Sequence, residues 1–147
     1  MLHLRGVNHS VLTFEVGEEH ISAVEVAKSL NIDADRLFKT LVCRDLESRL
    51  FVYVIPGSCE LDVKKAAEAA GVKRVRLIPV TELRETTGYV RGGCSPIGMK
   101  KHYPTFIDES ATLYEKIVVS AGARGEQLSL SPSDLIDITF AKCVDLV

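Results

Sequence analysis

Arg91-Gly92-Gly93-Cys94-Ser95-Pro96-Ile97-Gly98-Met99-Lys100-Lys101 is the stretch around which the chain is organised. Three glycines and a proline within seven residues exclude a helix or a central strand here. Because glycine has no Cβ, a ligand can approach the backbone amides closely. The flanking residues Arg91, Lys100, Lys101 and His102 add positive charge, which suits an anion or a polarised carbonyl oxygen. The alternative is an ordinary connection between two buried strands.

Lys39 is the second feature that points to a site. Residues 37–43 are mostly apolar and β-branched, which predicts a strand. Because side chains alternate along a strand, Lys39 shares one face with Leu37, Leu41 and Cys43. A lone ammonium among apolar neighbours either extends to solvent along its aliphatic stem or reaches into a pocket to meet a carbonyl, carboxylate or phosphate. The residues alone leave both alternatives open.

The rest of the chain predicts a mixture of strands and helices. Strands are expected at residues 10–16, 50–57, 72–79, 105–108, 116–120, 126–130 and 138–147. Helices are expected at 22–30, opened by Ser22 and Glu25 as a capping box, at 61–70, ended by Gly71, and at 81–85, capped by Thr81; a turn or helix begins at 131–134. A second glycine loop covers 121–125. The pattern indicates one α/β (α+β) domain over residues 1–147, with a curved, mostly antiparallel mixed sheet flanked by helices.

Composition excludes several classes of protein. The 147 residues carry a net charge of −2 with 46% hydrophobic residues, which suits one globular domain and argues against a broad DNA-binding face. The four cysteines and four histidines lack metal-ligand spacing, so we expect no metal, no cofactor and free thiols in a reducing cytoplasm. No apolar stretch approaches the length of a membrane span, and the first residues lack the features of a signal peptide.

Cys94 has its own alternative interpretation. A thiol in a cationic glycine loop, with His102 eight residues further on, would suit an activated nucleophile. Cys43 and Cys143 lie in apolar segments, so we expect both in the core.

Five segments together resemble the YbaK/EbsC family of aminoacyl-tRNA deacylases, relatives of the editing domain of bacterial prolyl-tRNA synthetases. The segments are Phe38-Lys39-Thr40-Leu41, Lys64-Lys65-Ala66-Ala67, Gly88-Tyr89-Val90-Arg91-Gly92-Gly93-Cys94-Ser95-Pro96-Ile97-Gly98, Val119-Ser120-Ala121-Gly122 and Ser131-Pro132-Ser133-Asp134-Leu135. The Gly-Gly-x-Ser-Pro-x-Gly form resembles the branch of the family that clears cysteine from mischarged tRNA(Pro).

The resemblance implies a barrel-like domain with helices around it and a set of site residues. The essential lysine falls on Lys39, and the loop that binds the aminoacyl carbonyl and terminal ribose falls on Gly92 to Gly98. Within that loop Gly93 and Ser95 take catalytic positions, while Gly92, Pro96 and Gly98 contact substrate. Further substrate contacts fall on Ser120, Gly122 and Asp134.

The resemblance also implies a mechanism and partners. The substrate's own thiol attacks the ester, which gives a cyclic thiolactone and free tRNA and needs positioning more than a protein nucleophile. The implied partners are the acceptor end of aminoacyl-tRNA and prolyl-tRNA synthetase, without membrane or DNA.

Three hypotheses therefore stand. The first is a trans-editing hydrolase for mischarged aminoacyl-tRNA, with Cys-tRNA(Pro) as its substrate. The second is a non-catalytic module that binds an aminoacyl or nucleotide group and docks on a synthetase. The third is a hydrolase that uses Cys94 as its nucleophile.

Overall fold

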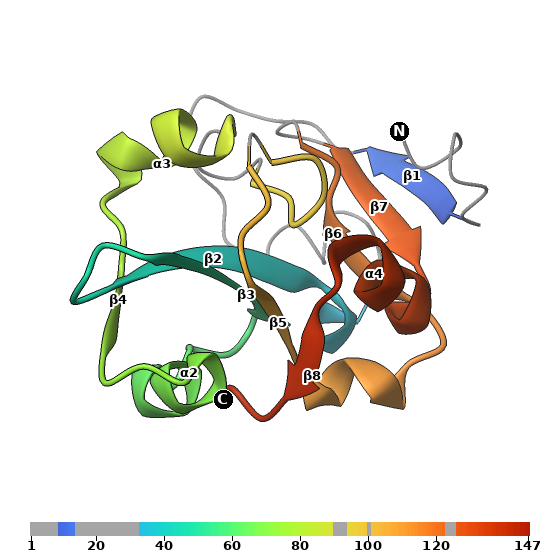
Figure 1. The fold of residues 1–147 in the computed structure, drawn as a ribbon. Coiled ribbons are helices and arrows are strands. Elements are labelled where there is room, and N and C mark those ends of the chain that lie inside the picture. The colour runs from blue at the N-terminus through green and yellow to red at the C-terminus, as the bar shows by residue number, and fades with distance from the viewer. Residues whose placement is uncertain (1–8, 14–32, 90–93, 100, 123–125) are drawn as a thin grey trace.

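The computed structural model describes residues 9–13, 33–89, 94–99, 101–122 and 126–147 (Figure 1). Along the chain its elements are β1 (His9–Thr13), η2 (Ala34–Arg36), β2 (Phe38–Asp45), β3 (Leu50–Pro56), α2 (Val63–Ala70), β4 (Val75–Leu77), α3 (Val80–Thr87), β5 (Thr105–Asp108), η3 (Glu109–Leu113), β6 (Ile117–Ser120), β7 (Glu126–Leu130), α4 (Pro132–Thr139) and β8 (Lys142–Val144). Within these ranges no helix combines the length and apolar character that crossing a bilayer requires.

The strands form two sheets that meet along one seam. Five strands lie in the order β4-β2-β3-β5-β8 and three in the order β1-β7-β6. Most pairs are antiparallel, but β5 pairs parallel with both β3 and β8. An isolated parallel bridge between Leu37 and Val118 places β2 alongside β6. The predicted α+β domain with a mixed, mostly antiparallel sheet is confirmed, although the described strands do not close into one barrel.

The main apolar core takes side chains from both sheets. Because side chains alternate along a strand, residues on one face of β2, β3, β5, β6 and β7 point into it. Its buried members are Phe38, Val54, Ile97, Ile107, Ala111, Ile117, Val119, Leu128, Leu130, Leu135 and Ala141. The intervening residues face outward, so each sheet has an outer face of its own.

Helix α2 covers the outer face of the larger sheet. It begins at Asp62, whose carboxylate accepts hydrogen bonds from two backbone N–H groups, and it ends at Gly71, which has a left-handed φ of 69°. The Tyr53 hydroxyl donates to the Ala66 carbonyl at 2.9 Å, which satisfies a buried polar group. The buried residues at this contact are Cys43, Phe51, Tyr53, Ile55, Ala66, Ala67, Val75, Phe106 and Leu146. Helix α3 lies on the opposite side of this sheet (Figure 1).

Two predicted elements were wrong in detail. The predicted strand at 138–147 is instead the end of α4, which continues to Thr139, followed by the short strand β8. Packing of Leu135 and Ile138 on the core overrides the strand propensity of this segment. Helix α3 begins at Val80 after Pro79, without the predicted Thr81 cap. The predicted helix at 22–30 and residues 14–16 of the first predicted strand lie outside the described residues.

Candidate functional site

The described part of the glycine loop folds back on itself and packs into the domain. The Ser95 hydroxyl, 1% exposed, accepts a hydrogen bond from the Ile97 N–H at 3.2 Å. This is the local turn that a serine side chain stabilises. Ile97 then enters the core, and Gly98 has a φ of 74°, a value that favours glycine. Gly92 and Gly93, which the sequence predicts to act on substrate, lie outside the described residues.

Tyr89 joins this loop to the second glycine loop. Its hydroxyl donates to the Ile97 carbonyl at 2.5 Å, and burial raises the pKa of Tyr89, which keeps the donor protonated. Its ring lies against Gly122, which has a φ of 99°; a Cβ at that position would be 3.0 Å from the ring carbon Cε1. No role was predicted for Tyr89, and its place directly before the glycine loop was the available signal.

Ser120 ends β6 just before Gly122 and faces the same way as Lys39. The Gly122 N–H donates to the Ser120 hydroxyl oxygen at 3.3 Å. Paired residues of parallel strands carry their side chains on the same face of the sheet, and Leu37 pairs with Val118 in an isolated parallel bridge. Lys39 and Ser120 each lie two residues further along, so their side chains are on that same face. Two of the predicted site residues therefore share the seam between the sheets.

Lys39 is half-buried at this seam and pairs with Ile55 across β2 and β3. Within the described ranges its ammonium has no hydrogen-bond or ion-pair partner. The outer face of the smaller sheet beside it is polar although it is buried, with Ser120, Gln127 and Ser129 at 9% exposure or less. These three side chains are not left unsatisfied: among the described residues, the buried side-chain oxygen without a hydrogen-bond partner is Thr40 Oγ1 on β2.

The glycine loop packs on the other face of β2. Cys94 contacts the group of buried residues that contains Val42, and Ile97 packs with Phe38; both of these β2 residues point away from the Lys39 face. The connection from the loop to the seam runs through Tyr89, Gly122 and Ser120.

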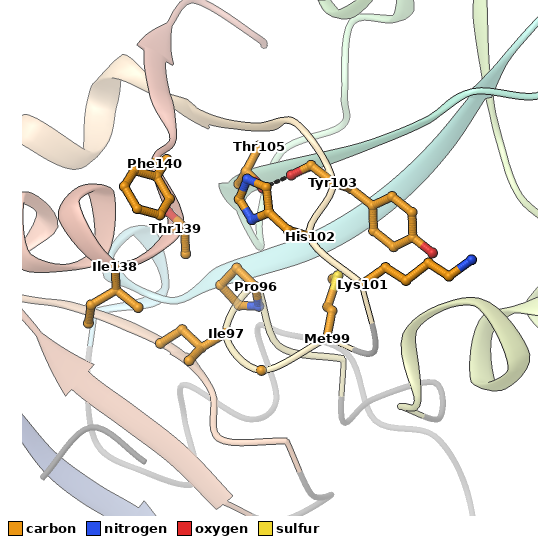
Figure 2. Close-up of a pocket in the computed structure, with 11 residues that line it drawn as sticks. Pro96, Ile97, Met99, Lys101, His102, Tyr103, Thr105, Ile138, Thr139 and Phe140 are labelled. Atoms are coloured by element: carbon orange, nitrogen blue, oxygen red, sulfur yellow. Dashed lines mark hydrogen bonds between the residues drawn. The ribbon is translucent and has the colours of Figure 1, made fainter. Parts of the chain in front are cut away.

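A cavity of about 320 Å³ lies between the glycine loop and the end of α4 (Figure 2). It brings together two predicted substrate contacts, Pro96 and Gly98. Its described lining is Pro96, Ile97, Gly98, Met99, Lys101, His102, Tyr103, Thr105, Ile138, Thr139 and Phe140. Lys39, Ser120, Gly122 and Asp134 are not in that lining. Asp134 lies in the first turn of α4, where its N–H donates to the Ser131 hydroxyl oxygen at 3.2 Å.

Cys94 and Cys43 are poorly suited to nucleophilic attack. Cys94 is 8% exposed, and burial raises its pKa to about 11, opposed by a hydrogen bond with Thr87. The thiolate is the reactive form, so this environment argues against an activated nucleophile. Cys43 is buried as predicted, with a pKa raised by burial to about 12. The prediction that Cys143 lies in the core was wrong, because β8 is short and leaves it exposed.

The fold is shared with proteins that edit aminoacyl-tRNA. Residues 18–138 match the aminoacyl-tRNA editing domain, so the chain belongs to that family. It is 47% identical over 99% of its length to the Enterococcus faecalis protein named "Putative Cys-tRNA(Pro)/Cys-tRNA(Cys) deacylase EbsC", and covers 89% of that protein.

Two further similarities are to proteins whose names refer to proline–tRNA charging or its editing. It is 27% identical to a proline–tRNA ligase of Shouchella clausii over 91% of the chain but 24% of the ligase. A solved structure described as "a putative trans-editing enzyme for prolyl tRNA synthetase" superposes with a TM-score of 0.83 at 25% identity, over 94% of this chain and 85% of that one.

Proposed function

We propose that this protein is a stand-alone hydrolase that removes cysteine from mischarged Cys-tRNA(Pro). Membership of the editing family and the similarity to EbsC support deacylation of aminoacyl-tRNA. The relation to a proline–tRNA ligase supports prolyl-tRNA synthetase as a partner. The protein acts in the cytoplasm, where tRNA is charged.

The observation that carries the proposal is the seam where Lys39 and Ser120 share one face. A half-buried lysine whose ammonium has no described partner, beside a buried polar face, is suited to bind a phosphate or ribose of the terminal adenosine by charge-assisted hydrogen bonds. A purely structural lysine at this position would gain little from its charge.

The glycine loop takes the reacting carbonyl. Backbone amides at Gly92 and Gly93 stabilise the oxyanion that develops on the ester, a contribution of about 10²–10³-fold for each donor in other enzymes. The Ser95 hydroxyl oxygen accepts from the Ile97 N–H, and this bond shapes the loop around Pro96 and Gly98. Ser120, Gly122 and Asp134 are proposed as further substrate contacts.

The attacking group is the thiol of the substrate's cysteine. Its sulfur forms a bond to the ester carbonyl carbon, the bond from that carbon to the ribose oxygen breaks, and the thiol proton ends on the ribose hydroxyl. The products are a cyclic thiolactone and free tRNA. The step requires orientation rather than a protein nucleophile, because an oriented intramolecular thiol has a very high effective concentration.

Release of labelled amino acid from Cys-, Ala- and Pro-tRNA(Pro) tests this proposal. We expect rapid release of cysteine and slower release of alanine and proline. Repeating the assay with prolyl-tRNA synthetase added tests the partner. If none of the three substrates is hydrolysed with or without the synthetase, the protein is a binding module and the proposal fails.

A further inference from the structure

Phe140 is an exposed aromatic residue in a backbone conformation that usually belongs to glycine. It ends α4 with a φ of 56°, in the left-handed region where Gly or Asn is common. Its side chain is 76% exposed, so the ring does not fill the core. Burial of the ring therefore does not compensate for the strained backbone, and such strain is typical of functional sites.

His102 and Phe140 form an aromatic corner at one end of the cavity. Their ring centroids are 5.8 Å apart and the ring planes are nearly perpendicular, at 87°. Both side chains are exposed, and both line the cavity. Flat, exposed aromatic rings of this kind are the surfaces on which unpaired bases stack.

The charge of the cavity favours a phosphate-bearing ligand. Among the described lining residues Lys101 and His102 are basic and none is acidic. Figure 2 shows the Lys101 side chain extended at the end of the cavity away from His102 and Phe140. A base at the aromatic corner would thus leave its phosphate free to approach the lysine, which binds phosphate as a compact charge.

We propose that this cavity binds the unpaired nucleotide that precedes the aminoacylated adenosine of the tRNA. The base stacks on Phe140 and the phosphate meets Lys101. A cavity of about 320 Å³ is at the small end of ligand sites, which suits one nucleotide rather than a longer segment. The cavity shares Pro96, Ile97 and Gly98 with the proposed ester site, and this continuity favours the end of an RNA over a free nucleotide. The identity of the RNA rests on the proposed function.

Fluorescence tests the stacking directly. The chain contains no tryptophan, so Phe140→Trp introduces a single reporter. Leu113→Trp is the matched control, since Leu113 is 79% exposed and lies outside the cavity lining. We expect uncharged tRNA(Pro) to quench the reporter at 140, tRNA(Pro) trimmed of its last three nucleotides to quench it far less, and neither RNA to quench the control. Equal quenching by both RNAs, or no quenching at 140, would overturn the proposal.

A substrate comparison tests the contribution to catalysis. Phe140→Gly removes the ring and suits the left-handed backbone, so the melting temperature should hold or rise. We expect kcat/KM for Cys-tRNA(Pro) to fall about tenfold, as for loss of one base stack, and to stay level for cysteinyl-adenosine, which lacks the preceding nucleotide. Equal losses on both substrates would contradict the inference. If the wild-type protein hydrolyses neither substrate, the proposed function fails, and the fluorescence result still decides this site.

Discussion

The outer faces of the two sheets differ in polarity. On the larger sheet, Tyr53, Ile55 and Phe106 pack under α2 in an apolar layer, and the one phenol is hydrogen-bonded. On the smaller sheet, Ser120, Gln127 and Ser129 are buried at a polar face. Apolar burial stabilises a fold, whereas polar burial does so only where partners exist. The apolar face thus holds the domain together, and the polar face, which Lys39 borders, is where we propose that a ligand's polar groups bind.

Removal of one ring from the apolar face should have the largest effect on stability. Phe106 is 4% exposed and stacks on Tyr53 with ring centroids 5.4 Å apart. We expect Phe106→Ala to lower the free energy of unfolding by about 3–5 kcal/mol, measured by urea denaturation, because it leaves a cavity. Activity per folded molecule should be unchanged. Leu77→Ala, at an exposed position of β4 in the same sheet, is the control and should cost little; equal losses would contradict the assignment of this face.

Gly122→Ala tests the connection between the polar seam and the glycine loop. The variant combines a strained φ with a contact to the Tyr89 ring, so it should lose about 2 kcal/mol or more of stability, together with deacylation activity. Gly71 also has a positive φ, of 69°, but a Cβ there meets nothing within 4 Å, so Gly71→Ala should lose only about 1–2 kcal/mol, with its activity intact. Comparable activity in the two variants would show that Tyr89 does not position the loop.

Lys39→Ala should lower kcat/KM by at least about tenfold, equivalent to ~1.4 kcal/mol of transition-state stabilisation, with the fold retained. Lys39→Arg should rescue poorly, because a planar guanidinium differs in shape from a compact ammonium. Lys64→Ala is the control, because Lys64 is an exposed lysine on α2, the helix that covers the apolar face. An alanine variant at 39 with wild-type rates on Cys-tRNA(Pro) would remove Lys39 from the site.

Cys94→Ala should have the smallest effect on activity, well below that of Lys39→Ala. With a pKa of about 11, about one thiol in a thousand is ionised at pH 8. Burial raises this pKa above its ordinary value of 9.0, so the thiol stabilises the fold below pH 9, and that contribution is lost as the pH rises from 9 toward 11. In urea denaturation at increasing pH, the free energy of unfolding of the variant should therefore fall less between pH 9 and 11 than that of the wild type. A drop of several orders of magnitude in activity would instead identify Cys94 as the nucleophile.

Local signals predicted most of the fold. Period-two alternation placed Lys39 on the face of Leu41 and Cys43, and Gly71 marked the end of α2, because both signals act between near neighbours. The prediction of a strand around Phe140 was wrong, because the packing of α4 on the core outweighs the strand propensity of this segment.

The arrangement of the site was harder to predict. The contact of Tyr89 with Gly122 and the bridge that sets Lys39 beside Ser120 join segments far apart in the sequence. No local pattern encodes such contacts. The cavity at the end of α4 escaped prediction for the same reason.

The bridge between Leu37 and Val118 also has a kinetic consequence. The two residues lie far apart in the sequence, and a loop of that length must close before they can pair. The parallel pairing of β3 with β5 is likewise nonlocal. Lys39 and Ser120 are therefore separated until the chain has condensed, whereas the contacts that begin and end α2, at Asp62 and Gly71, are local. After dilution from denaturant, helical signal should return before deacylation activity, and activity should return together with protection of the β2 and β6 amides from hydrogen exchange.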